Sequence, residues 1–171
     1  MKIQKFLPLS FFILFICSCT NDSKDNSIYY ISFDDLSGYL ENSTIINNNG
    51  AYSGNKLVRL NKDYMYGPTF SKKIGELRLA KINSVVISGW VKTDNKANGI
   101  KLVCSIDNTE KTVFWEAVDS KTSNLEKDSW LHISTKLDIS KFNNSENKLN
   151  IYPMHEGPGN TYLDDLEFYF E

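Results

Sequence analysis

The fold class is decided by the end of the chain, Thr161-Tyr162-Leu163-Asp164-Asp165-Leu166-Glu167-Phe168-Tyr169-Phe170-Glu171. Its later residues alternate between apolar side chains and mostly polar ones: Leu166, Phe168 and Phe170 against Asp165, Glu167, Tyr169 and Glu171. Successive side chains of a strand point to opposite faces, so this period of two predicts a strand with one buried face. By the same alternation, we expect Asp164 to point inward with Leu166.

Short segments of the same kind recur through the chain, rich in β-branched and aromatic residues and almost without helical periodicity. They cover residues 28–33, 56–60, 84–91, 100–106, 111–118, 130–137, 147–153 and 161–170. Turn-forming clusters separate them, and residues 107–110 are short enough to join two of them as a hairpin. About eight half-buried strands predict an all-β jelly-roll β-sandwich of two antiparallel sheets. Residues 70–82 hold either a strand or one short helical turn.

The first residues of the chain have the layout of a secretory signal. Lys2 and Lys5 precede an apolar run over residues 6–16, which is too short to span a bilayer. Ser18 before Cys19 resembles the lipobox of bacterial lipoproteins, which implies lipidation of Cys19; a plain cleaved signal is the alternative. We expect a bacterial cell-envelope protein, lipid-anchored on the periplasmic side or exposed at the surface. Its expected parts are a signal peptide (1–18), a flexible tether (19–27) and one domain (28–171).

The amino-acid composition indicates which classes of partner to expect and whether the chain folds. Of 19 basic residues, 17 remain once Lys2 and Lys5 leave with the signal, against 21 acidic ones, and no dense basic stripe is present. Nucleic acid is therefore not an expected partner. Aromatic residues make up 13% of the chain, whereas disordered chains are poor in them, so we expect a folded domain. Cys104 alternates with Leu102 and Ile106, which favours a buried small hydrophobe.

Four motifs follow one another along the domain. They are Ile31-Ser32-Phe33-Asp34-Asp35; Ala51-Tyr52-Ser53-Gly54-Asn55-Lys56-Leu57-Val58; Ile87-Ser88-Gly89-Trp90-Val91-Lys92 with Asp128-Ser129-Trp130-Leu131-His132-Ile133; and Thr161-Tyr162-Leu163-Asp164-Asp165-Leu166-Glu167. In this order they resemble the carbohydrate-binding modules of the galactose-binding-domain-like jelly-roll superfamily, the type attached to bacterial cellulases and xylanases. The resemblance spans nearly the whole of the expected domain. It implies the fold more strongly than a ligand, because one sandwich hosts many functions.

The resemblance also implies a structural calcium ion (Ca²⁺). In the family, its ligands fall at positions that correspond to Asp34 and Asp164 here, and a backbone carbonyl joins them near Asn55 or Lys56. An inward carboxylate, as predicted for Asp164, needs a hydrogen-bond donor or a cation. Calcium accepts carboxylate and carbonyl oxygens from separate loops. The alternative is that Asp164 caps backbone N–H groups at the start of its strand.

Sugar binding in such modules depends on aromatic rings that stack on pyranose faces, either on the concave face of one sheet or on loops at one edge. Trp90 and Trp130 stand where the family has buried packing residues, so we assign both to the core. Trp115 is either a core residue beside Val113 and Ala117 or an exposed ring on a sheet face.

Further ligand candidates come from a loop and a strand. Tyr64 and Tyr66 lie in a loop-like stretch, and their alternative role is packing over one end of the sandwich. Tyr152 and Asn150 face away from the core, and Arg59 is expected to reach the same surface. The sequence therefore predicts a ligand groove lined by Tyr64, Tyr66, Trp115 and Tyr152.

The sequence contains no recognisable arrangement of catalytic residues. His132 and His155 lack the spacing of a metal site, and Cys104 has no evident base. Neighbouring acids on a strand point to opposite faces, so neither Asp34-Asp35 nor Asp164-Asp165 can flank one glycosidic bond. We expect a non-catalytic envelope protein that binds a polysaccharide or oligosaccharide through exposed aromatics. The alternative is an accessory envelope lipoprotein that holds a protein partner through the same sandwich face.

Overall fold

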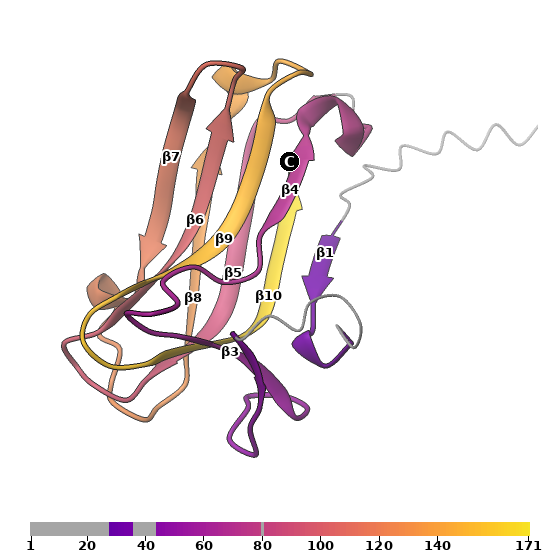
Figure 1. Cartoon of the computed structure of the whole chain (residues 1–171). Helices are drawn as coiled ribbons and strands as arrows, with labels where there is room; N and C mark the ends of the chain where they lie inside the picture. The colour runs from indigo at the N-terminus through magenta and orange to yellow at the C-terminus, as the bar shows by residue number, and fades with distance from the viewer. Residues whose placement is uncertain (1–27, 36–43, 80) are drawn as a thin grey trace, which may run out of the picture.

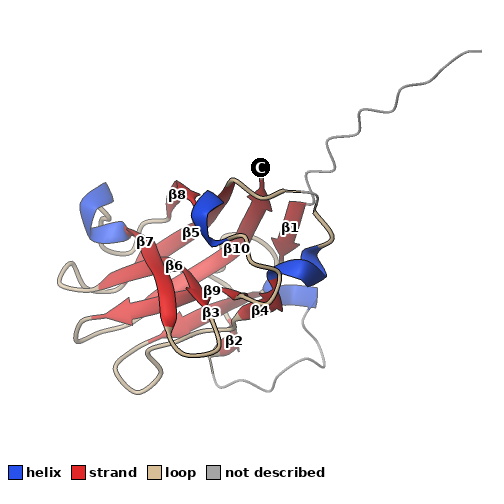
Figure 2. Cartoon of the chain, turned by 90° about the horizontal axis from the view of Figure 1, so that it is seen from above, coloured by secondary structure: helices blue, strands red, loops and turns tan. Residues whose placement is uncertain are grey.

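The computed structural model describes residues 28–35, 44–79 and 81–171. The expected signal peptide, Cys19 and the expected tether lie outside the described residues. Figure 1 shows the described part as two layers of strands, and Figure 2 shows the same layers from above. None of the helices in these ranges has the length and apolar character that a membrane crossing requires.

Both layers are antiparallel sheets. The six-stranded sheet has the order β2 (Ile45–Asn47), β3 (Lys56–Leu60), β10 (Thr161–Phe170), β5 (Ser84–Thr93) and β8 (Leu131–Asp138), and β1 (Ile28–Ile31) also pairs with β10. The four-stranded sheet has the order β4 (Phe70–Lys73), β9 (Lys148–Glu156), β6 (Gly99–Asp107) and β7 (Thr112–Asp119). In the described part of the chain, four 3-10 helices lie between strands: η1 (Phe33–Asp35), η2 (Ile74–Leu77), η3 (Ser120–Ser123) and η4 (Ser140–Phe142).

The predicted all-β sandwich is confirmed. Each of the eight predicted segments contains a strand, and β6 and β7 pair antiparallel around the predicted turn at residues 107–110. The segment 70–82 contains both alternatives, because β4 is followed at once by η2. The two missed or undecided strands, β2 and β4, have three and four residues, and each pairs with one neighbour only.

The core lies between the two sheets. The alternation along strand β5 shows how the core forms. Val85, Ile87 and Val91 are fully buried, whereas Val86, Ser88 and Trp90, which point the other way, are half-buried. On β10, Phe168 and Phe170 belong to the same core cluster. Cys104 also lies in it, as predicted, and burial raises the pKa of its thiol to about 12. The thiol is therefore neutral at physiological pH.

Strand β10 contains a bulge that reverses the predicted direction of Asp164. Asp164 is in register with Trp90 of β5, and the next paired residue, Glu167, is in register with Ser88. Three residues of β10 thus match two of β5, which places one extra residue in β10. Residues opposite each other on paired strands share a face, so Asp164 lies on the outer face of the six-stranded sheet. The inward orientation predicted from simple alternation is wrong.

The assignment of Trp90 and Trp130 to the core is also wrong. Trp90 projects from the outer face of the six-stranded sheet and is half-buried beneath Tyr52, with ring centroids 3.8 Å apart and an interplanar angle of 14°. The rings of Trp130 and the same tyrosine form a T-shaped pair, with centroids 6.0 Å apart. The Lys92 ammonium lies 4.5 Å from the Trp130 ring centroid and donates to the carbonyl of Gly50 at 2.8 Å. These rings fasten a loop to the sheet surface.

Candidate functional site

The outer face of the four-stranded sheet carries a groove of about 370 Å³. Its lining combines aromatic rings with hydroxyl, amide and carboxylate groups: Tyr66, Thr69, Ser105, Asp107, Thr112, Trp115, Asn150 and Tyr152. This volume lies within the range of small-molecule binding sites, and a few polar groups among rings is the composition typical of them. Three of the four predicted groove residues therefore meet in one place.

Strand register explains this convergence. Because residues opposite each other on paired strands share a face, the outer face of the sheet carries parallel rows of side chains. One row contains Trp115, Ser105, Asn150 and Ser71, and the next contains Ala117, Val103 and Tyr152. A third row contains Asp119, Lys101, Met154 and, through an isolated bridge, Tyr66. The rings thus lie on a diagonal that crosses the sheet from β7 to the loop beside β9.

The three rings of the groove hold one another in place. The indole N–H of Trp115 donates to the hydroxyl of Tyr152 at 3.2 Å. The ring of Tyr152 meets Tyr66 edge-on, with centroids 6.0 Å apart. Trp115 is 46% exposed and Tyr66 is 57% exposed, so both rings remain open to solvent. The exposed alternative for Trp115 is the observed one, and its neighbour Phe114 points into the core instead.

Tyr66 reaches the groove because its loop lies along β9. Gly67 donates its backbone N–H to the carbonyl of Pro153 at 3.1 Å, and His155 donates to the carbonyl of Met65 at 2.8 Å. A Cβ atom on Gly67 would lie 2.5 Å from Cγ of Pro153, so glycine permits this close approach. The loop is therefore fixed at its middle by two backbone hydrogen bonds.

The polar side of the groove is an ordered hydrogen-bond network. The Asn150 amide donates to Oδ2 of Asp107 at 2.8 Å, and its carbonyl accepts from the hydroxyl of Ser71 at 2.6 Å. The hydroxyl of Thr112 donates to Oδ1 of Asp107, also at 2.6 Å. Such a network fixes the direction of each donor and acceptor before a ligand arrives. Beside the rings, it offers hydrogen-bonding groups of the kind that match sugar hydroxyls.

Two candidates named from the sequence lie elsewhere. Tyr64 is exposed on the same loop as Tyr66 but is not among the residues that line the groove. Arg59 lies on β3 opposite Tyr162, on the outer face of the other sheet, so the expectation that it reaches the groove is wrong. The residues that the sequence reasoning missed are polar. Ser105 could have been found, because it alternates with the core residues Cys104 and Ile106.

The two carboxylates expected to bind calcium, those of Asp34 and Asp164, accept hydrogen bonds from the backbone of a loop. Asp34 Oδ1 accepts the backbone N–H groups of Asn55 and Lys56 at 2.8 and 3.0 Å. Asp164 Oδ2 accepts those of Tyr52 and Ser53 at 2.9 and 3.1 Å. Gly54 between them has a φ of +57°, and a Cβ there would lie 1.8 Å from the Asp34 carboxylate. The two carboxylates thus hold both halves of one tight loop, which we call the clamped loop (residues 52–56).

These contacts do not fit a calcium site. Calcium takes six to eight oxygen ligands, but here backbone N–H groups face the Asp34 and Asp164 carboxylates. Lys56 brings its ammonium to the Asp34 carbonyl at 3.2 Å, a position that repels a metal ion. Within residues 28–35, 44–79 and 81–171, no group of three or more His, Cys, Asp or Glu side chains could hold a metal. The calcium ion stays an untested prediction. Asp164 does accept backbone N–H groups, but two of them belong to Tyr52 and Ser53 of the clamped loop and the third to Asp165 within β10, not to the start of its strand.

Burial changes the pKa of the Asp164 carboxyl. Its side chain is fully buried beneath the clamped loop, and this desolvation raises the pKa of its carboxyl above the ordinary value. The hydrogen bonds from Ser53, Asp165 and Tyr52 act in the opposite direction, because they stabilise the charged form. Next to it, Asp165 accepts from the hydroxyl of Tyr30 at 2.6 Å, which raises the pKa of that tyrosine to about 12. This corner of the fold therefore joins β1, β10 and the clamped loop.

A second hollow, of about 450 Å³, lies at one end of the sandwich. Its lining is Asn108, Thr109, Val113, Phe142, Asn144, Glu146 and Asn147. It contains neither tryptophan nor tyrosine, and the network around Asn150 does not extend into it. The groove is therefore the better candidate for a functional site.

No protein-family model matches the chain, and no curated protein sequence matches it. Several solved structures are similar. A xylan-binding module of family 15 shares 17% sequence identity at a TM-score of 0.54, with 85% of this chain and 97% of that chain covered. A family 22 xylan-binding domain of Xyn10C from Paenibacillus barcinonensis shares 15% identity at a TM-score of 0.52, with 85% and 95% covered.

A third similar structure is a larger protein. It is the N-terminal xylanase 10B fragment of Clostridium thermocellum, which joins a family 22 carbohydrate-binding module to a catalytic module and was solved with xylohexaose. It shares 15% identity at a TM-score of 0.50, and this chain covers 25% of its length. At such identities the similarity establishes the fold. The chain has a jelly-roll β-sandwich fold similar to that of these carbohydrate-binding modules.

Proposed function

We propose that this protein is a non-catalytic glycan-binding protein, and that the groove on the four-stranded sheet is its binding site. One observation supports the proposal most directly. Trp115, Tyr152 and Tyr66 meet in an open groove beside an ordered row of hydrogen-bonding groups. Aromatic faces suit the C–H surfaces of pyranose rings, and the amide and hydroxyl groups suit sugar hydroxyls. Similar folds in xylan-binding modules make a β-linked plant polysaccharide such as xylan the first ligand to test.

Electrophoresis in native gels that contain a polysaccharide tests this function. We expect xylan, β-glucan or mannan to retard the protein relative to a gel without polysaccharide, with bovine serum albumin as the unretarded control. The expected cause is stacking of sugar rings on the exposed rings of the groove. If none of these polymers, nor pectin or host glycans, retards the protein, the glycan function fails. The alternative then gains support, namely an envelope lipoprotein that binds a protein partner through the same face.

We also propose that the protein is anchored to a bacterial membrane by a lipid on Cys19. The proposal comes from the sequence alone, where Ser18 and Cys19 follow a basic start and a short apolar run. Labelling with radioactive palmitate in a bacterial host tests it. We expect the wild-type protein to take up label and the Cys19→Ala variant to take up none. An unlabelled wild-type protein would leave the plain secretory signal as the correct interpretation.

A further inference from the structure

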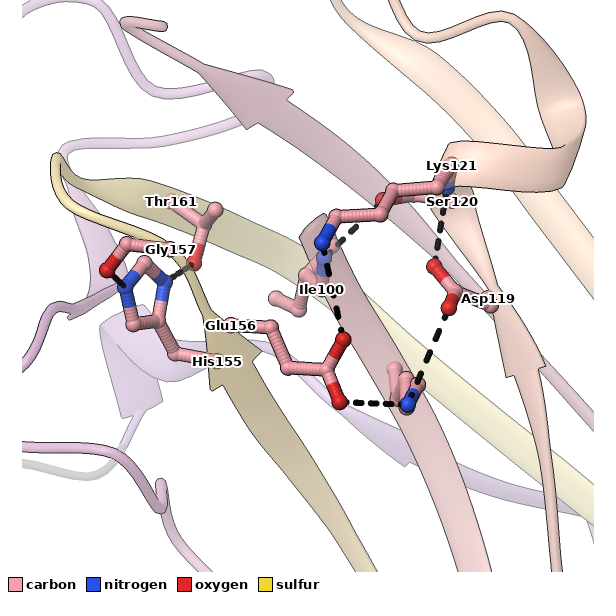
Figure 3. A network of polar contacts seen from close by, with 9 residues as sticks. Ile100, Asp119, Ser120, Lys121, His155, Glu156, Gly157 and Thr161 are labelled. Atoms are coloured by element: carbon pink, nitrogen blue, oxygen red, sulfur yellow. Dashed lines mark hydrogen bonds and ion pairs between the residues drawn. The ribbon is translucent and has the colours of Figure 1, made fainter. Parts of the chain in front are cut away.

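A group of four charged side chains lies on the same sheet face as the groove. The ammonium of Lys101 is 2.5 Å from Oε1 of Glu156 and 3.8 Å from Oδ2 of Asp119. The other oxygen of Glu156 lies 3.5 Å from the ammonium of Lys121, and Figure 3 shows these two side chains pointing toward each other. We call these four residues the charged cluster. With two lysines and two acids, its net charge is zero.

The charged cluster is continuous with the groove. Lys101 and Asp119 stand in the same row of the sheet as Met154 and Tyr66, and Tyr66 lines the groove. Two residues along a strand span about 7 Å, so Lys101 lies one row beyond the row that contains Tyr152. The Lys101 side chain is 20% exposed and that of Glu156 is 35% exposed, so both are open to solvent on the sheet face that carries the groove.

The backbone on both sides of the cluster is fixed. Next to Glu156, the buried ring of His155 contacts the Thr161 hydroxyl at 3.0 Å and the Gly157 carbonyl at 2.9 Å. Next to Lys101, the backbone N–H of Ile100 donates to the Ser120 hydroxyl at 2.9 Å. The hydrogen bond between Lys101 and Glu156 raises the pKa of the ammonium and lowers that of the carboxyl. The pair therefore meets a ligand as a preformed donor beside a preformed acceptor.

The chemistry of this pair indicates the ligand. Each sugar hydroxyl both donates and accepts a hydrogen bond, so two neighbouring hydroxyls can bridge an ammonium and a carboxylate at once. The zero net charge of the cluster gives an anionic sugar no electrostatic advantage, because each lysine is already paired with an acid. A neutral sugar unit fits this arrangement better than a uronic acid.

We infer that the Lys101–Glu156 pair forms an additional subsite, which binds a neutral sugar unit of a chain whose other units stack on Trp115 and Tyr152. This inference rests on the proposed glycan function. With this subsite, the binding site extends beyond the aromatic rings, so that long oligosaccharides bind more tightly than short ones. The gain in affinity with length depends on the charged cluster, whereas binding as such depends on the rings.

Calorimetry with xylotriose and xylohexaose tests the inference, or with the matching pair from the polysaccharide that retards the protein. We expect wild type to prefer the hexasaccharide by about tenfold, the size of a single hydrogen bond to a charged group. In Lys101→Met and Glu156→Gln, this ratio should fall toward one. Lys136→Met is the matched control, because Lys136 forms an equally short pair with Glu171 on the other sheet. Melting temperatures of all three variants check that they fold.

The outcomes separate this inference from the proposed function. If wild type binds neither oligosaccharide and no polysaccharide retards it, the glycan function itself fails. If wild type binds but K101M and E156Q keep its preference for the hexasaccharide, the additional subsite is overturned while the groove stands. A preference for oligogalacturonate over neutral chains of equal length would overturn the neutral class of the ligand.

Discussion

Replacing Trp115 with alanine is expected to abolish retardation by the polysaccharide that retards the wild-type protein. The indole is the largest exposed ring in the groove, and its N–H orients Tyr152. Removing a central aromatic residue from a binding site costs about 2 kcal/mol or more, which is about a thirtyfold rise in Kd. Tyr152→Ala should act in the same direction. Affinity electrophoresis and calorimetry measure both effects.

Two matched variants give this prediction its controls. Trp130→Ala removes an indole from the outer face of the opposite sheet, and we expect it to bind glycan like wild type. Phe114→Ala changes the residue next to Trp115 on the inward side, where loss of a core ring costs about 3–5 kcal/mol of stability. W115A should instead melt within a few degrees of wild type. Normal retardation of W115A, or loss of retardation in W130A, would contradict the assignment of the groove.

Replacing Asp164 with alanine is expected to lower the stability more than any other single change outside the apolar core. The carboxylate accepts three backbone N–H groups, from Tyr52, Ser53 and Asp165. Each buried donor left without an acceptor costs about 1–3 kcal/mol, so we expect a total loss of about 3 kcal/mol. For a chain of this size, that corresponds to a fall of about 10 °C in Tm. Differential scanning calorimetry measures it.

The same experiment decides the calcium question. We expect Asp164→Asn to fall between wild type and D164A, since an amide keeps one acceptor, and the exposed Asp63→Ala to melt like wild type. Wild type should melt at the same temperature in EDTA and in millimolar CaCl₂, because backbone N–H groups already face both carboxylates. A clear rise of Tm with calcium would instead establish the metal, and a D164A variant as stable as wild type would refute the clamp.

The sandwich could be predicted because each strand shows an alternation of apolar and polar residues within its own sequence. The alternation along β5 and β10 shows directly which side chains point inward, and turn residues mark the strand ends. The same alternation predicts that Trp90 points outward, because Trp90 has the same parity as Ser88 and Lys92 and opposite parity to Val91. The resemblance to a family of domains outweighed that signal and placed Trp90 in the core. For Trp90, the alternation along the strand predicted the direction of the side chain correctly, and the resemblance did not.

Other features could not be predicted from one sequence. The bulge in β10 reverses the alternation at Asp164, and a period of two does not show where an extra residue enters a strand. Likewise, the pairing of Lys101 with Glu156 depends on the register between β6 and β9, which are far apart in the chain. The same holds for the meeting of Trp115 with Tyr152. The sequence left Trp115 either buried or exposed and placed Tyr152 on the outer face, whereas the contact between the two rings arises from tertiary structure.

The distribution of the three tryptophans gives the molecule an internal optical reporter. Trp115 is the one that lies in the groove, whereas Trp90 and Trp130 lie on the opposite sheet against Tyr52. A sugar ring stacked on Trp115 changes the polarity around that indole and leaves the other two emitters unchanged. The stacked Tyr52 and Trp90 rings, in turn, report on closure of the clamped loop through near-ultraviolet dichroism. Ligand occupancy and loop closure can therefore be followed separately in one unlabelled sample.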